Sequence, residues 1–157
     1  MKDSSDAIVL ITSRDRNRRD FGTGFVIDRE GDNTYVLTCA HVVRDVGGKE
    51  QVVAGGIPAI AIASGEEIGF DLALLQVQGL ENQPCLGLRL HAETNQKFEI
   101  AGFYQFDPKS PPALRMIRGT LGEPIQLASR DGSDRINGWD LKIEGDYYLQ
   151  PGYSGSP

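Results

Sequence analysis

A serine near the end of the chain stands in a pattern typical of a nucleophile. Ser154 lies in the string PGYSGSP at residues 151–157, which has the form Gly-x-Ser-Gly-x-Pro. A serine hydroxyl is a weak nucleophile until an adjacent base takes its proton. The string therefore predicts a base elsewhere in the chain, brought beside Ser154 by the fold.

The histidines offer two candidates for that base, His41 and His91. His41 lies in the run LTCAHVV at residues 37–43, directly after a predicted strand, so its imidazole is expected at the end of a barrel. His91, in the run LHAE, is expected to be an ordinary surface or loop histidine. We therefore assign the base to His41.

An imidazole that acts as a base must be held in one tautomer by a carboxylate. Asp71 is the candidate, because it leads the apolar run of GFDLALL at residues 69–75, whereas most other acids lie among polar residues. We expect its carboxylate to be embedded in apolar surroundings, since a solvated one would orient nothing. The chain thus holds the three members of a serine triad.

The composition limits the partners of the chain. Its 157 residues are 39% hydrophobic and 24% charged, which predicts a globular domain able to bury a core. The net charge of −6, with no extended basic face, argues against nucleic acid as a partner. No apolar stretch approaches the roughly 20 residues that cross a bilayer, and the first apolar run is too short for a signal peptide core. We expect a cytoplasmic protein that does not contact membranes.

Short apolar runs separated by turn residues predict an all-β protein. The 19 glycines and 8 prolines fall between these runs, and no long amphipathic helix is apparent. Strands of this length with regular turn signals indicate a barrel or a sandwich. We expect strands at residues 7–12, 21–28, 34–39, 51–54, 57–63, 69–77, 97–104, 113–127 and 136–143.

Four segments in this order resemble the chymotrypsin-like serine peptidases, most closely their bacterial HtrA-like branch. They are GTGFVI at residues 22–27, LTCAHVV at 37–43, FDLALL at 70–75 and QPGYSGSP at 150–157. His, Asp and Ser also follow one another in the chymotrypsin order. The resemblance covers residues 7–157 and implies a chymotrypsin-like double β-barrel that hydrolyses polypeptides.

The resemblance implies a role for each residue of the site. Ser154 Oγ would attack the scissile carbonyl, and His41 would act as general base and then as general acid. Asp71 would orient His41 and stabilise its cationic form. The backbone N–H groups of Gly152 and Ser154 would form the oxyanion hole.

The same resemblance implies a division of the chain. We expect a first β-barrel at residues 1–81, a connection at 82–95 and a second β-barrel at 96–157. Double barrels of this kind run about 200–250 residues. We therefore expect that the second barrel is incomplete, that the 157-residue chain is a fragment, and that it is weakly active or inactive alone. Its open edge would favour pairing with another chain, as in an oligomer.

Tyr148 departs from the trypsin pattern. It stands six residues before Ser154, where trypsin carries an acid that selects basic P1 side chains. A preference for Lys or Arg is therefore not expected, and the resemblance to the HtrA-like branch implies small or medium apolar P1 residues. Tyr148 itself becomes a candidate residue of the substrate pocket.

The remaining reactive residues are expected to be structural. Cys39 and Cys85 are predicted to be buried small hydrophobic residues, with a 39–85 disulfide as the lesser alternative. The charged loop RDRNRRD at residues 14–20 is predicted to be a solvated hairpin tip, with docking of an acidic partner as its alternative. We expect no cofactor and no metal, because no cluster of His, Cys and acids at ligand spacing is apparent.

Two other interpretations stay open. In a catalytically silent pseudo-protease, the same cleft would bind peptides without cutting them. Alternatively, the domain would be one module of a larger bacterial sensing or defence protein, with fused or associated regulatory domains. Labelling with a fluorophosphonate separates an enzyme from a pseudo-protease.

Overall fold

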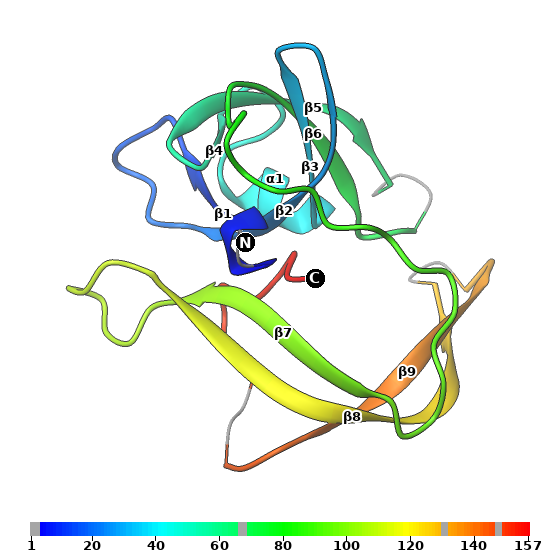
Figure 1. Ribbon diagram of the computed structural model, residues 1–157. Helices are drawn as coiled ribbons and strands as arrows, with labels where there is room; N and C mark the ends of the chain where they lie inside the picture. The colour runs from blue at the N-terminus through cyan, green and yellow to red at the C-terminus, as the bar shows by residue number, and fades with distance from the viewer. Residues whose placement is uncertain (1–3, 66–68, 130–131, 147–148) are drawn as a thin grey trace.

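The computed structural model describes residues 4–65, 69–129, 132–146 and 149–157 (Figure 1). It is almost entirely β-structure, with a short 3-10 helix η1 (Ser4–Ala7) and one short helix α1 (Ala40–Asp45) in the described residues. The strands are β1 (Ile8–Ser13), β2 (Gly22–Glu30), β3 (Asn33–Thr38), β4 (Val52–Ala54), β5 (Ile57–Ser64), β6 (Ala73–Gln78), β7 (Lys97–Tyr104), β8 (Ala113–Ala128) and β9 (Arg135–Ile143). Every expected strand overlaps one of them.

The first six strands close into a barrel in the order β1-β2-β3-β6-β5-β4, with antiparallel neighbours. Successive side chains of a strand point to opposite faces, so every second side chain points into the barrel. In β3, for example, half-buried and buried residues alternate. Branched side chains fill the interior, because they suit a pleated surface that is packed on one face. Its fully buried members include Ile11, Val26, Val36, Leu75 and Val77.

The last three strands form a second antiparallel sheet in the order β7-β8-β9. β8 pairs with β7 along its first half and with β9 along its second, and its register with β9 shifts between Leu121 and Pro124. The sheet is thinly covered, with Leu127 52% exposed. The expected chymotrypsin-like fold, with one complete barrel and an incomplete second one, is confirmed.

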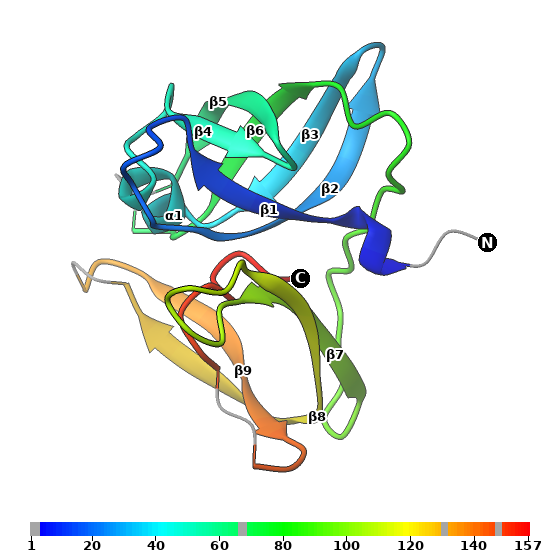
Figure 2. The ribbon, with the colours of Figure 1, turned by 90° about the vertical axis from the view of Figure 1, so that its left-hand side faces the viewer.

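The barrel and the sheet meet through β2 and β7. Ile8 and Phe25 of the barrel form a small buried cluster with Ala101 of β7. Figures 1 and 2 show the C-terminal segment, in red, entering between the two units. Residues 79–96 connect the units without a helix or strand, and Leu86 N donates to Val26 O (2.8 Å) on the way.

Two local features differ from the sequence-based expectation. Helix α1 was not predicted, because its six residues are too few to show a helical period. β6 begins at Ala73 and not at residue 69, because Gly69 has a φ of 82° and Phe70 N donates to Gly65 O in a turn. Both differences lie beside the candidate site. Tyr148 lies outside the described residues.

Candidate active site

The loop that carries Ser154 is fastened to β2 of the first barrel. Thr23 N donates to Ser154 O (2.9 Å), and the Thr23 hydroxyl donates to Gly152 O (2.7 Å). The same hydroxyl accepts a bond from Phe103 N (2.8 Å), at the end of β7. Thr23 is fully buried. One threonine therefore joins the barrel, the second sheet and the loop.

Two glycines allow the loop to lie this close to the barrel. Gly155 has a φ of 86°, and a Cβ there would clash with the backbone oxygen of Thr23. Gly152 has a φ of 106°, and a Cβ there would clash with the ring of Phe21. Because both the backbone conformation and the space exclude a side chain, the Gly-x-Ser-Gly pattern is required by the packing of the loop.

Asp71 holds His41 at two points. Its Oδ1 accepts a hydrogen bond from His41 N (2.9 Å), and its Oδ2 lies 2.5 Å from His41 Nδ1. His41 stands in the first turn of α1, so its N–H has no partner within the helix and is free to bind the carboxylate. With an ionised Asp71, Nδ1 carries the proton of the neutral imidazole and Nε2 carries the lone pair. That is the tautomer a general base requires.

The expectation that Asp71 is embedded in apolar surroundings is wrong. Its side chain is 55% exposed, against 33% for that of His41. Its neighbours Phe70 and Leu72 are also exposed, because residues 69–72 form an open turn ahead of β6. The pair of hydrogen bonds, and not burial, fixes the carboxylate on His41.

His41 and Ser154 border one open cleft, with a volume of about 270 Å³. Its other lining residues are Arg19, Asp20, Phe21, Val42, Asp45, Pro151 and Gly152. Among the hydrogen bonds of the described residues, none joins Ser154 Oγ to His41. Such bonds are often long in unliganded enzymes and tighten when substrate binds.

The charged loop at residues 14–20 reaches this cleft. All its residues are exposed, which confirms the expected solvated tip. Arg18 Nη1 donates to Asp45 O (3.0 Å), which ties the loop to the end of α1. Arg19 and Asp20 consequently border the cleft, a placement that the sequence pattern did not indicate.

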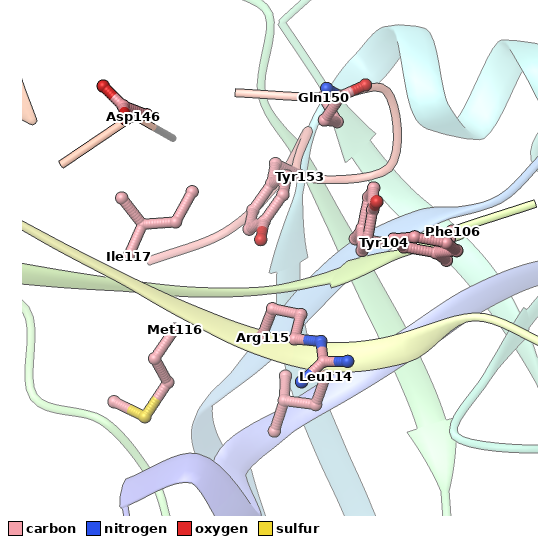
Figure 3. Close-up of a pocket in the computed structure, with 9 residues that line it drawn as sticks. All are labelled: Tyr104, Phe106, Leu114, Arg115, Met116, Ile117, Asp146, Gln150 and Tyr153. Carbon is pink, nitrogen blue, oxygen red and sulfur yellow. The ribbon is translucent and has the colours of Figure 1, made fainter. Parts of the chain in front are cut away.

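Aromatic packing from the second unit supports the Ser154 loop. Tyr153 stacks on Tyr104 with ring centres 6.4 Å apart, and Phe106 meets Tyr104 edge-on at 6.2 Å. These rings lie beside an open cavity of about 570 Å³ that Arg115 also borders, and Figure 3 shows the side chains that line it. Partial burial raises the pKa of Tyr153. The residue before Ser154 is thus a packing residue of the second unit.

Cys39 lies close to His41 and Asp71 and packs against the barrel core. The ligand atoms of Cys39, His41 and Asp71 all lie within 4.8 Å of one another. The pKa of Cys39 is raised to about 11, mainly by burial of the thiol and secondly by the negative charge of Asp71. A hydrogen bond from the Gly155 backbone lowers this pKa by a smaller amount. The sequence pattern did not anticipate this grouping, because Asp71 is remote from Cys39 along the chain.

The cysteines differ in their surroundings. Cys39 is half-buried and packs against the barrel core, as expected of a small hydrophobic residue. Cys85 is exposed, so the expectation of burial is wrong for it. Both thiols are free, and the alternative of a disulfide between them is excluded in this structure. His91 is exposed in the connection between the units, as expected.

The family of the chain follows from the comparison with known domains. Residues 22–157 match the model of the trypsin-like peptidase domain, so the chain belongs to that family. A comparison with curated protein sequences gives no match. No helix in the described residues is long and apolar enough to cross a membrane.

Solved structures share the fold over nearly the whole chain. One is a serine-to-alanine mutant of Rv3671c from M. tuberculosis in its inactive form, with a TM-score of 0.70, 22% identity, and coverage of 98% of this chain and 69% of that chain. The active form of the Rv3671c protease from M. tuberculosis has a TM-score of 0.65 and 23% identity, and the match covers 98% of this chain and 65% of that chain. The serine endoprotease from Yersinia pestis has a TM-score of 0.61 and 19% identity, and the match covers 98% of this chain and 49% of that chain.

Proposed function

We propose that this chain is a serine endopeptidase domain that cuts polypeptides through Ser154, His41 and Asp71. The observation that carries the proposal is the double hydrogen bond from His41 to Asp71, at the border of a cleft that Ser154 also reaches. Membership of the trypsin-like peptidase domain family supports it. A triad is recognised by such geometry and roles.

In the proposed mechanism, Ser154 Oγ attacks the carbonyl carbon of the scissile peptide while its proton passes to His41 Nε2. Asp71 stabilises the imidazolium that results, because its carboxylate stays bonded to Nδ1. His41 then gives the proton to the leaving amine, and the acyl group stays on Ser154 Oγ. A water molecule, deprotonated by His41 in turn, attacks the acyl carbon, and His41 then returns the proton to Ser154 Oγ as the acyl group leaves as a carboxylic acid.

The backbone N–H groups of Gly152 and Ser154 are proposed to bind the oxyanion. Among the hydrogen bonds of the described residues, neither N–H donates to a protein acceptor. The carbonyls of the same two residues are held by Thr23, which limits rotation of the loop. Loss of one oxyanion donor costs roughly 3–4 kcal/mol of transition-state stabilisation in other enzymes.

A fluorophosphonate probe tests this proposal without knowledge of the substrate. We expect the probe to label the native chain at Ser154, and labelling to be lost in Ser154→Ala and in His41→Ala. Ser156→Ala is the matched control, since it removes a hydroxyl two residues away and should keep its label. A folded wild-type chain that stays unlabelled would instead identify a peptide-binding pseudo-protease.

A further inference from the structure

Three chemically different ligand groups meet beside the cleft. Cys39 directly precedes helix α1, and His41 lies in the first turn of that helix. Asp71 lies close to Cys39 and His41, in the segment that leads into β6. Their ligand atoms lie within 4.8 Å of one another. Thiolate, imidazole and carboxylate are the groups that hold Zn²⁺ in proteins, and three of them with one open position form a common coordination set.

The distances require a small adjustment for a metal ion. Zn²⁺ bonds of about 2.0–2.3 Å in a tetrahedral arrangement place ligand atoms roughly 3.3–3.6 Å apart. The 2.5 Å between His41 Nδ1 and Asp71 Oδ2 must therefore widen by about 1 Å, and Cys39 Sγ must move inward. Asp71 can make this movement, because its side chain is 55% exposed and its residue belongs to no strand.

The ligand set also selects among cations. A soft thiolate beside an imidazole favours zinc over magnesium and calcium, which prefer oxygen ligands. The partial exposure of His41 and Asp71 gives an ion a path from solvent. A water molecule would complete the coordination.

We propose that Cys39, His41 and Asp71 bind Zn²⁺, and that the bound ion arrests the hydrolysis proposed above. The thiol proton of Cys39 leaves to solvent. The ring proton of His41 moves from Nδ1, which bonds the metal, to Nε2. Nε2 then has no lone pair to accept the proton of Ser154. The arrest rests on the proposed function, whereas binding of the ion does not.

Co²⁺ serves as a spectroscopic probe for the binding site. We expect a thiolate-to-cobalt charge-transfer band in the near ultraviolet with the wild-type chain, and its disappearance when Zn²⁺ displaces the cobalt. The band should be absent in Cys39→Ser. Cys85→Ser is the matched control and should keep it, because Cys85 is exposed and free. A wild-type chain without the band, or the same band in folded Cys39→Ser, overturns the proposal.

Alkylation of the wild-type chain tests the site without a variant, in case Cys39→Ser does not fold. Iodoacetamide modification of both cysteines is followed by mass spectrometry, with and without Zn²⁺. We expect Zn²⁺ to slow modification of Cys39 and not of Cys85. An unchanged rate at Cys39, or equal slowing at both cysteines, contradicts a specific site.

Inhibition is measured by the rate of fluorophosphonate labelling, relative to the metal-free rate of each variant. The Zn²⁺ concentration for half-inhibition should rise at least about 10–100-fold in Cys39→Ser, the loss typical of a weakened metal site. Labelling that is insensitive to Zn²⁺ would remove the arrest and leave the peptidase proposal standing. Cobalt binding without any labelling would remove the peptidase proposal and leave the metal site standing.

Discussion

The buried hydroxyl of Thr23 donates a 2.7 Å hydrogen bond to the carbonyl oxygen of Gly152, two residues before Ser154. The Thr23 carbonyl is itself held by the hydroxyl of Thr38 (2.7 Å), on the strand that leads to His41. β2, the strand β3 that leads to His41, and the Ser154 loop are therefore connected by two threonine side chains. The position of Ser154 relative to His41 depends on this connection.

Thr23→Val tests the connection. Valine keeps the shape of threonine but leaves Gly152 O and Phe103 N without their partner, and each buried group left unpaired costs about 1–3 kcal/mol. We expect a lower free energy of unfolding and a lower kcat/KM, measured by denaturant titration and peptide hydrolysis. Thr12→Val is the control on β1. Equal effects of the two substitutions would contradict a special role for Thr23.

Asp71→Asn should reduce kcat by up to about 10⁴-fold, the loss seen when the orienting carboxylate of a serine triad is replaced by an amide. The cause is the wrong tautomer of His41, so KM should change little. Because Asp71 is 55% exposed, the melting temperature should stay close to that of the wild type. Asp45→Asn, at another acid of the same cleft, should keep kcat. A small effect of Asp71→Asn would show that Asp71 does not orient the base.

Cys39 should make the fold sensitive to alkaline pH. The folded protein raises the pKa of this thiol from 9.0 to about 11, so above pH 9 the unfolded chain releases the thiol proton more readily than the folded chain. The stabilising contribution is complete below pH 9 and is lost as the pH rises to about 11. We expect the difference in unfolding free energy between the wild type and Cys39→Ser to fall over this range. A difference that does not change with pH would contradict the shift.

Arg19 should favour acidic side chains beside the scissile bond. It borders the cleft with His41 and Ser154, whereas Arg16 of the same loop does not line it. Exposed ion pairs contribute about 0.2–1 kcal/mol, so Arg19→Ala should lower the kcat/KM ratio of Glu-containing to Gln-containing peptides by up to about fivefold. Salt should reduce the same ratio in the wild type. If Arg16→Ala lowers the ratio equally, the effect belongs to the net charge of the loop.

The strands could be predicted because their information is local. In β1 and β3, the apolar character of a few neighbouring side chains predicts which side of the strand is buried. Glycine and proline mark the turns between strands. His41 and Ser154 could be proposed as site residues for the same reason, because each lies in a short pattern; their roles stay a prediction. The incomplete second barrel followed from the same resemblance.

What the sequence could not reveal depends on contacts between distant residues. Thr23 and Gly152 are 129 residues apart, and neither carries a mark that pairs it with the other. Asp71 was expected to be buried from its apolar neighbours, but the turn that frees it for His41 also exposes it. The approach of Cys39 to His41 and Asp71 likewise follows from barrel closure and not from any spacing along the chain.

The attachment of the Ser154 loop to β2 has a consequence for redesign of the protein. Thr23 holds both anchored carbonyls of the loop, and His41 and Asp71 also belong to the first barrel. The second sheet reaches this assembly near Phe103 and Tyr104, at one end of β7, and again at Ser129 after β8, which lies against Gly69 in the turn before Asp71. Segments of the second sheet away from these contacts can therefore accept new sequences or insertions while His41, Asp71 and Ser154 keep their spacing.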